Sequence, residues 1–224
     1  MRIAVISDVH SNVYALRAAI EKLNVYKPDK IVFTGDLVGV GVFPEETVSL
    51  AREQQNAVFV VGNHDIFAYT GESPFREGTA KRALFEYQQK VISEDTKEFL
   101  RSLPASAIFD ADDMKVHCLH YPYVDGRFKD LIYRPTRTEL KKLFEGLSGD
   151  VFLFGHEHTG SLEEFCGRYY INFGTCGSYL KSNCARCGIV DVRGKKLTYK
   201  SIDAYYDDAT PKRRQYEVIK NILG

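Results

Sequence analysis

The histidines of this chain are concentrated in a few short polar blocks, and this distribution constrains the fold more than any other feature. Five of the six histidines lie in these blocks or directly after an apolar run. The segments are Asp8-Val-His10, Gly35-Asp36, Gly62-Asn63-His64-Asp65, His120 and Gly155-His156-Glu157-His158. Each follows residues typical of a strand and resembles a strand end entering a turn. The fold is therefore expected to gather side chains that are far apart in sequence.

The size and composition of the chain predict one globular unit. With 224 residues, of which 44% are apolar, it can bury a sizeable core, and we expect a single domain over residues 1–224. Thirty basic and thirty acidic residues balance, so no basic stripe indicates nucleic acid as a partner. The apolar runs have strand length, well below the roughly 20 residues that span a membrane. The N-terminus has no signal-peptide pattern, which predicts a cytoplasmic protein.

The cysteines do not predict a disulfide framework or a structural metal. Their number is five, which is odd, and the chain shows no secretion signal. Cys184 and Cys187 have the spacing of a zinc or redox pair. A closed zinc site needs four ligands, and no second pair is present. We therefore expect two ordinary reduced cysteines.

The first third of the chain alternates between strand and helix patterns. Apolar runs at residues 2–7, 30–34 and 58–61 are typical of buried strands. Helical spacing of apolar residues follows at 13–27, and a helix is predicted from Pro44 to about Gln55. This alternation is typical of a parallel sheet with helices packed on it.

The pattern then changes. A helical insertion is predicted over about residues 66–103, with two helices of which the second is capped by Ser93. A hairpin at 105–119, a helix after Thr136 and mainly strands from 161 onward follow. A terminal helix begins at about residue 210 and needs a surface, either its own sheet or a second copy of the chain. Two packed sheets with outer helices fit this order better than one doubly wound sheet.

The polar blocks carry the side chains of a metal site. Asp8 and His10 lie two residues apart, as do His156 and His158, and on an extended chain this spacing points both side chains to one face. Imidazoles combined with carboxylates suit Mn, Fe, Ni, Co or Zn better than Ca or Mg. Because few carboxylates serve the set, two divalent ions would keep a net positive charge, which favours a phosphate ester. Two ions about 3.5–4 Å apart can stabilise the attacking and leaving oxygens of a displacement.

These blocks resemble the calcineurin-like metallophosphoesterase superfamily, over residues 2 to about 178. The run from Gly35-Asp36 through Gly39 and Gly41 to Pro44 is similar to its small bacterial and archaeal phosphodiesterase branch. The resemblance implies the metallo-dependent phosphatase fold, an α/β (α+β) protein built as a four-layer α/β/β/α sandwich. In such a fold, two mixed sheets are flanked by helices and the metals lie at strand ends.

The same resemblance assigns roles to individual residues. It implies that a first metal is held by Asp8, His10 and His158. A second metal would be held by Asn63, His120 and His156. Asp36 would bridge the two metals. His64 would face the phosphate and stabilise the transition state or protonate the leaving oxygen. Asp65 would orient His64 or raise its pKa, with a turn-capping aspartate as the alternative. His117 lies three residues before His120, should point to the opposite face, and is interpreted as a non-ligand.

Other positions separate this chain from some relatives. Protein serine/threonine phosphatases carry an aspartate and an arginine where this chain has Gly39 and Val40, so a phosphoprotein phosphatase is disfavoured. Residues 172–178 resemble a glycine-serine loop that passes near the metals. Polar and aromatic residues after His120 are predicted either to line the substrate mouth or to form an exposed loop, namely Tyr121, Tyr123, Arg127 and Arg134.

The expected function is hydrolysis by a dinuclear metal-dependent phosphoesterase, a phosphodiesterase or phosphatase, through a metal-bridging hydroxide. The cofactors would be two divalent ions, Mn²⁺ first, with Fe, Ni, Co or Zn as alternatives. The expected partner is a small phosphate ester, nucleotide-like or not, with neither membrane nor nucleic acid involved. The rival hypothesis is a binding scaffold that kept the fold and lost catalysis. The intact ligand set and His64 favour the enzyme.

Overall fold

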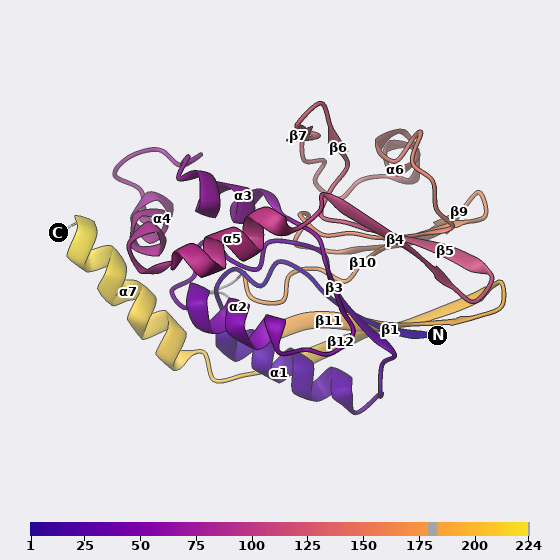
Figure 1. The fold of residues 1–224 in the computed structure, drawn as a ribbon, viewed down its shortest axis with the longest axis horizontal. Helices are drawn as coiled ribbons and strands as arrows, with labels where there is room; N and C mark the ends of the chain where they lie inside the picture. The colour runs from indigo at the N-terminus through magenta and orange to yellow at the C-terminus, as the bar shows by residue number, and fades with distance from the viewer. Residues whose placement is uncertain (179–182, 224) are drawn as a thin grey trace.

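The computed structural model describes residues 1–178 and 183–223, and Figure 1 shows two sheets with helices on their outer sides. The elements in chain order are β1 (Arg2–Ile6), α1 (Val13–Asn24), β2 (Lys30–Phe33), α2 (Pro44–Arg52), β3 (Ala57–Phe59), α3 (Asn63–Thr70), α4 (Ala80–Val91), α5 (Glu94–Ser102), β4 (Ser106–Ala111), β5 (Met114–Leu119), β6 (Tyr123–Val124), β7 (Arg127–Phe128), α6 (Arg137–Leu143), β8 (Val151–Leu153), β9 (Ser161–Phe165), β10 (Arg168–Asn172), β11 (Cys184–Arg193), β12 (Lys196–Tyr205) and α7 (Ala209–Leu223).

Both large sheets are mixed. The first has the order β12-β11-β1-β2-β3, in which β1, β2 and β3 are parallel and the other two pairs are antiparallel. The second has the order β4-β5-β8-β10-β9, with a parallel centre and antiparallel pairs at both edges. The predicted four-layer α/β/β/α sandwich of two mixed sheets is confirmed.

Strand alternation divides the core into layers. In β1, Ile3 and Val5 belong to the apolar cluster between the two sheets, where they meet residues such as Val116 and Leu153. Ala4 and Ile6, one residue out of step, face the helices instead. Successive side chains of a strand point to opposite faces, so a strand buried on both sides is apolar throughout. This explains the continuous apolar run that predicted β1.

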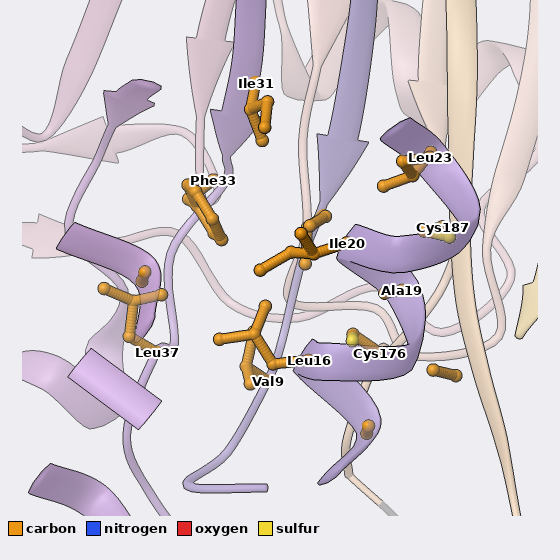
Figure 2. Packing of buried hydrophobic residues seen from close by; sticks show 14 of the residues in the cluster. Val9, Leu16, Ala19, Ile20, Leu23, Ile31, Phe33, Leu37, Cys176 and Cys187 are labelled. Atoms are coloured by element: carbon orange, nitrogen blue, oxygen red, sulfur yellow. The ribbon is translucent and has the colours of Figure 1, made fainter. Parts of the chain in front are cut away.

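The layer outside the first sheet is built around α1. Asn12 caps this helix, because its side-chain oxygen accepts a hydrogen bond from the Ala15 amide at 3.1 Å. Leu16, Ala19, Ile20 and Leu23 then recur at helical spacing, and Figure 2 shows them directed at the sheet. Cys176 and Cys187 lie in the same cluster. Cys187 is a buried packing residue of this cluster, whereas Cys184 is partly exposed.

The terminal helix packs on another helix of the same chain and not on the sheet that the sequence suggested. Its Val218 joins Leu84 of α4 and Val42 in a small apolar cluster, and Gln215 donates a hydrogen bond to the Val40 carbonyl at 2.7 Å. Figure 1 shows α7 lying beside α4, away from the sheets. Its apolar stripe therefore covers another helix of the same chain. No helix within the described part of the chain is long and apolar enough to cross a membrane.

Two features of the fold were not predicted from the sequence. Asn63 begins a helix, α3, where only a turn was expected, so the chain between β3 and β4 holds three helices. The small β6–β7 hairpin was also missed, because each of its strands has only two residues. The hairpin β4–β5 and the Ser93 cap of α5 are confirmed.

Candidate metal centre

The polar blocks all follow the carboxyl ends of parallel strands. Asp8, Asp36 and Asn63 come after β1, β2 and β3 of the first sheet, while His120 and His156 come after β5 and β8 of the second. The carboxyl ends of parallel strands meet at one edge of a sheet. Because the two sheets are packed face to face, the two edges adjoin and the blocks converge.

Unusual backbone geometry aims these side chains. Asp8, His10, Asp36 and His156 have φ values of 53°, 51°, 53° and 69°, in the left-handed region that non-glycine residues rarely adopt. Hydrogen bonds hold the loops in place, including His10 N to Asp36 O at 3.0 Å. The extended-chain argument for the Asp8–His10 and His156–His158 pairs is therefore wrong. Asp8 and His10 do share a cluster, whereas His156 and His158 lie in different clusters. Strain of this kind is typical of functional sites.

The converging side chains form three overlapping clusters. The clusters are Asp8–His10–His158, His10–Asp36–His64 and Asp36–His120–His156, with the ligand atoms in each lying within 4.8 Å of one another. Asn63 joins the last cluster, since its side-chain oxygen lies 3.0 Å from His120 Nε2. The structure thus brings together all seven residues predicted as ligands. It also brings His64 within ligand reach, which the sequence did not suggest.

The side chains of the three clusters together with Asn63 form a cage. Contacts with residues outside this cage determine which imidazole nitrogens face inward. The His120 Nδ1–H donates to the Thr34 carbonyl at 2.8 Å. Nε2 is therefore unprotonated, and its lone pair is directed at the cage. His158 Nδ1 lies 3.0 Å from Ser178 Oγ, and its Nε2 lies 3.1 Å from His10 Nε2. His120 Nε2 and His156 Nδ1 are also 3.1 Å apart. Donors that share one divalent ion at about 2.0–2.2 Å lie roughly 3 Å from each other, so these spacings fit.

The aspartates present oxygen atoms to the same space. Asp8 Oδ2 accepts from the Ser7 hydroxyl and the His156 amide, whereas the buried Oδ1 lies 3.2 Å from His158 Nε2. Asp36 Oδ1 accepts from the His64 amide at 2.8 Å. Asp36 Oδ2 lies 3.5 Å from His120 Nε2 and 3.8 Å from His10 Nε2, between two clusters. Two carboxylates buried this close together are costly, and bound cations would compensate their charge.

Burial keeps most of these imidazoles neutral. It lowers the pKa of His64 and of His156 to about 3, with further lowering from the charge of His120, and it lowers the pKa of His10 and of His120 as well. His158 differs: burial lowers its pKa, but the contact with Asp8 outweighs this and raises it. Neutral imidazoles are the form that binds metal.

We expect the metal-free protein to lose stability as the pH falls from 7 to 5. An imidazole whose pKa is lower in the folded state takes up its proton more readily in the unfolded state. Protonation therefore does not affect the free energy of unfolding above pH 6.5 and lowers it progressively below that pH. For His64 alone, the free energy of unfolding should fall by about 2 kcal/mol. Urea unfolding of chelator-treated protein measures this. The variant His64→Asn should show a flatter pH profile, and equal stability at both pH values would contradict the expectation.

Asp65 supports the loop that carries Asp36. Its buried carboxylate accepts from the amides of Asp36, Val38 and Gly62 at 2.9, 3.1 and 2.9 Å. Burial raises its pKa to about 7, although these amides oppose the shift. The contacts agree with the turn-capping alternative, and a role of Asp65 in catalysis stays a prediction.

Sequence reasoning missed Gln88, a second support of the same site. This buried residue lies on α4, and its side-chain oxygen accepts from the Gly39 amide at 2.8 Å and from Ser11 Oγ at 3.4 Å. Gly39 lies so close to His10 that an added Cβ would be 2.5 Å from Nδ1. The available signal was a polar residue on the apolar face of a helix beside Leu84 and Phe85.

The residues after His120 belong partly to the interior and partly to an exposed loop, and a role in lining the substrate mouth stays a prediction. Tyr121 is fully buried, with its ring centroid 5.0 Å from that of His156. Phe128 of the β6–β7 hairpin packs against His120 and His156 at 5.5 and 6.4 Å. Tyr123 is exposed, and the Arg134 guanidinium lies over the exposed Tyr133 ring. His117 stands apart from the cage, since its Nδ1 contacts the Ser148 carbonyl at 2.8 Å.

Comparisons with known proteins agree with this geometry. An uncharacterized protein of Methanocaldococcus jannaschii is 40% identical over 156 residues, which cover 70% of this chain and 62% of that protein. This chain therefore matches less than two thirds of that relative's length. A phosphodiesterase of the same organism is 24% identical over 196 residues, covering 88% of this chain and 96% of the relative. The crystal structure of a metallophosphoesterase from Sphaerobacter thermophilus superposes with a TM-score of 0.74 at 23% identity, over 98% of this chain and 97% of that one.

The family assignment depends on a match over most of the chain. The model of the calcineurin-like phosphoesterase superfamily domain matches residues 1–195, which include every block of the metal centre. Members of this family work with divalent metal ions, and the Asp and His clusters described above have the donors to hold them. The chain belongs to the calcineurin-like phosphoesterase superfamily.

Proposed function

We propose that this protein is a phosphoesterase that uses two divalent metal ions, Mn²⁺ first, to hydrolyse a phosphodiester or a nucleotide-like phosphate ester. The observation that carries the proposal is the position of Asp36 Oδ2 between the His10 and His120 clusters. A carboxylate placed between two groups of donors suits a pair of metal ions about 3.5–4 Å apart. The phosphodiesterase named among the relatives favours a diester.

The metal ligands in this proposal are the seven residues predicted from the sequence. They are Asp8, His10, Asp36, Asn63, His120, His156 and His158. When bound, two divalent ions would polarise the phosphate and activate a water molecule. The protein's own contribution is to hold the ligands ready: Thr34 and Ser178 fix two imidazoles, and the His64 amide fixes Asp36. Such preorganisation reduces the rearrangement needed during the reaction.

His64 is the proposed general acid or transition-state hydrogen-bond donor. Its ring centroid lies 4.8 Å from that of His10, and its outer side contacts Phe67 and Phe75, each at 5.7 Å. The imidazole is therefore held beside the cage by aromatic packing. Because its pKa is lowered to about 3, the ring is neutral, and its N–H can donate a hydrogen bond to a phosphate oxygen. Protonating the leaving oxygen requires the imidazolium form, which bound phosphate would have to stabilise.

Hydrolysis of bis(p-nitrophenyl) phosphate tests the proposed activity. Purified protein should release p-nitrophenol when Mn²⁺ is added after chelator treatment, and the same assay with Ni, Co, Fe and Zn ranks the metals. A panel of cyclic nucleotides, dinucleoside polyphosphates and phosphomonoesters would then define the substrate. Absence of turnover with all five metals and the whole panel would contradict an enzymatic function. Cages that stay empty at neutral pH would instead revive the scaffold hypothesis.

Replacing His64 by Ala should lower kcat by about 100-fold or more and leave the metal content unchanged. Metal analysis by mass spectrometry, alongside steady-state kinetics, measures both quantities. His117→Gln is the matched control, because His117 is also buried but lies outside the clusters. Loss of metal in proportion to activity would show that His64 is a ligand, as its place in the His10–Asp36–His64 cluster would allow.

A further inference from the structure

A lysine lies at the edge of the metal cage and has no part in the proposed ligand set. Lys81 is exposed on the first turn of α4, and its ammonium group lies over the Phe75 ring at 5.8 Å from the centroid. The same ring packs against His64 at 5.7 Å, with the planes inclined by 34°. One aromatic side chain therefore separates the ammonium group from the proposed acid.

The helix that carries Lys81 is anchored to the site. Gln88 lies seven residues further along α4 and bonds to Gly39, the residue that touches His10. Residues seven apart lie on one face of a helix, two turns or about 10 Å from each other. The face of α4 that contacts Gly39 through Gln88 therefore also carries Lys81.

The positive charge of Lys81 has no ionic partner among the described residues. Its charge is therefore available to an anion.

We propose that Lys81 is a specificity-determining residue that binds a dianionic phosphoryl group, so that it strengthens the binding of monoesters and terminal phosphates more than the binding of diesters. The inference rests on the proposed phosphoesterase function and deepens it. Phe75 holds the aliphatic part of the lysine beside His64, while rotation of the long side chain brings the ammonium group to the phosphate oxygens. A monoester carries two negative charges and a diester carries one, so a nearby cation attracts the monoester twice as strongly.

The experiment compares the Mn²⁺-loaded wild type with the variants Lys81→Met, Lys81→Arg and Lys90→Met. Once the side chain has rotated to bring the ammonium group within about 6 Å of the phosphate, a unit charge contributes roughly tenfold in binding of a dianion and roughly threefold for a monoanion. Lys81→Met should therefore lower kcat/KM for p-nitrophenyl phosphate about tenfold, through KM, and for bis(p-nitrophenyl) phosphate about threefold. Added salt should shrink both effects. Lys81→Arg keeps the positive charge and should retain the wild-type ratio of the two kcat/KM values. Lys90→Met, a charge loss at the far end of α4, should change neither kcat/KM value.

A second readout separates this inference from the proposed function. Calorimetric titration of the same proteins with inorganic phosphate needs no turnover, and Lys81→Met should weaken binding about tenfold at low salt. If the wild type hydrolyses neither ester, phosphate binding that depends on Lys81 still supports the subsite. Unchanged phosphate affinity in Lys81→Met, or an equal loss of kcat/KM for both esters, would overturn it.

Discussion

Replacing Asp36 by Asn is expected to lower kcat/KM at least about 1,000-fold while making the metal-free protein more stable. Activity falls while stability rises because the same carboxylate binds the metal ions and, in the metal-free protein, is a buried charge that opposes folding. Burial, together with the charges of Asp65 and Asp8, raises the pKa of Asp36 well above its usual range. Such a group opposes folding once the pH exceeds its unfolded pKa, near 3.8.

The stability gain should therefore be present at neutral pH and vanish in acid, where Asp36 is protonated in both states. The isosteric amide keeps the hydrogen bond from His64 N, so the loop remains in place. Thermal melting with and without Mn²⁺ measures both effects on stability. The Tm of the wild type should rise when the metal is added, and the Tm of the variant should rise much less. Asp110→Asn is the matched control, since Asp110 is exposed on β4 and distant from the cage. A variant with normal metal content and activity would disprove the shared-ligand role.

The second large effect is expected from Gly62→Ala. A Cβ on Gly62 would overlap the Asp36 carboxylate oxygen and amide nitrogen, and would lie 2.8 Å from Asp36 Cγ. Neither group can move, because Asp65 holds the amide and the His64 amide holds the carboxylate. Overpacking against fixed groups should reduce the free energy of unfolding by about 3 kcal/mol or prevent folding. Metal binding should be lost in any protein that folds.

Gly78→Ala separates this close approach from the general effect of adding a methyl group. An added Cβ at Gly78 meets no atom within 4 Å, so only its φ of 73° opposes alanine. That conformation costs about 1 kcal/mol, a shift in Tm of roughly 2–4 °C for a chain of this size. Chemical denaturation of both variants provides the comparison. Equal stability and equal metal content in the two would contradict the close-packing explanation at Gly62.

Local patterns were sufficient for the framework of the fold. The apolar run of β1 and the helical spacing of α1 follow directly from burial on two faces or on one. Asn63 shows the limit of such reasoning, because α3 begins there without an apolar stripe and is held by the Asp65 cap and tertiary contacts. Likewise, α7 has an apolar face that any surface could cover, and only the packing on α4 decides which.

The sequence by itself determined the chemistry of the site: the identity of its donors, their position after strand ends and the resemblance that grouped them. Only the tertiary structure decided how these donors are presented. The inward nitrogen of His120 depends on the Thr34 carbonyl, and the place of Asp36 between two clusters depends on a left-handed φ. The docking of α4 brings Gln88 to Gly39 and places Lys81 over the Phe75 ring beside His64. The physical reason is that donor type and strand register are local properties, whereas orientation and charge environment arise from contacts between segments distant in sequence.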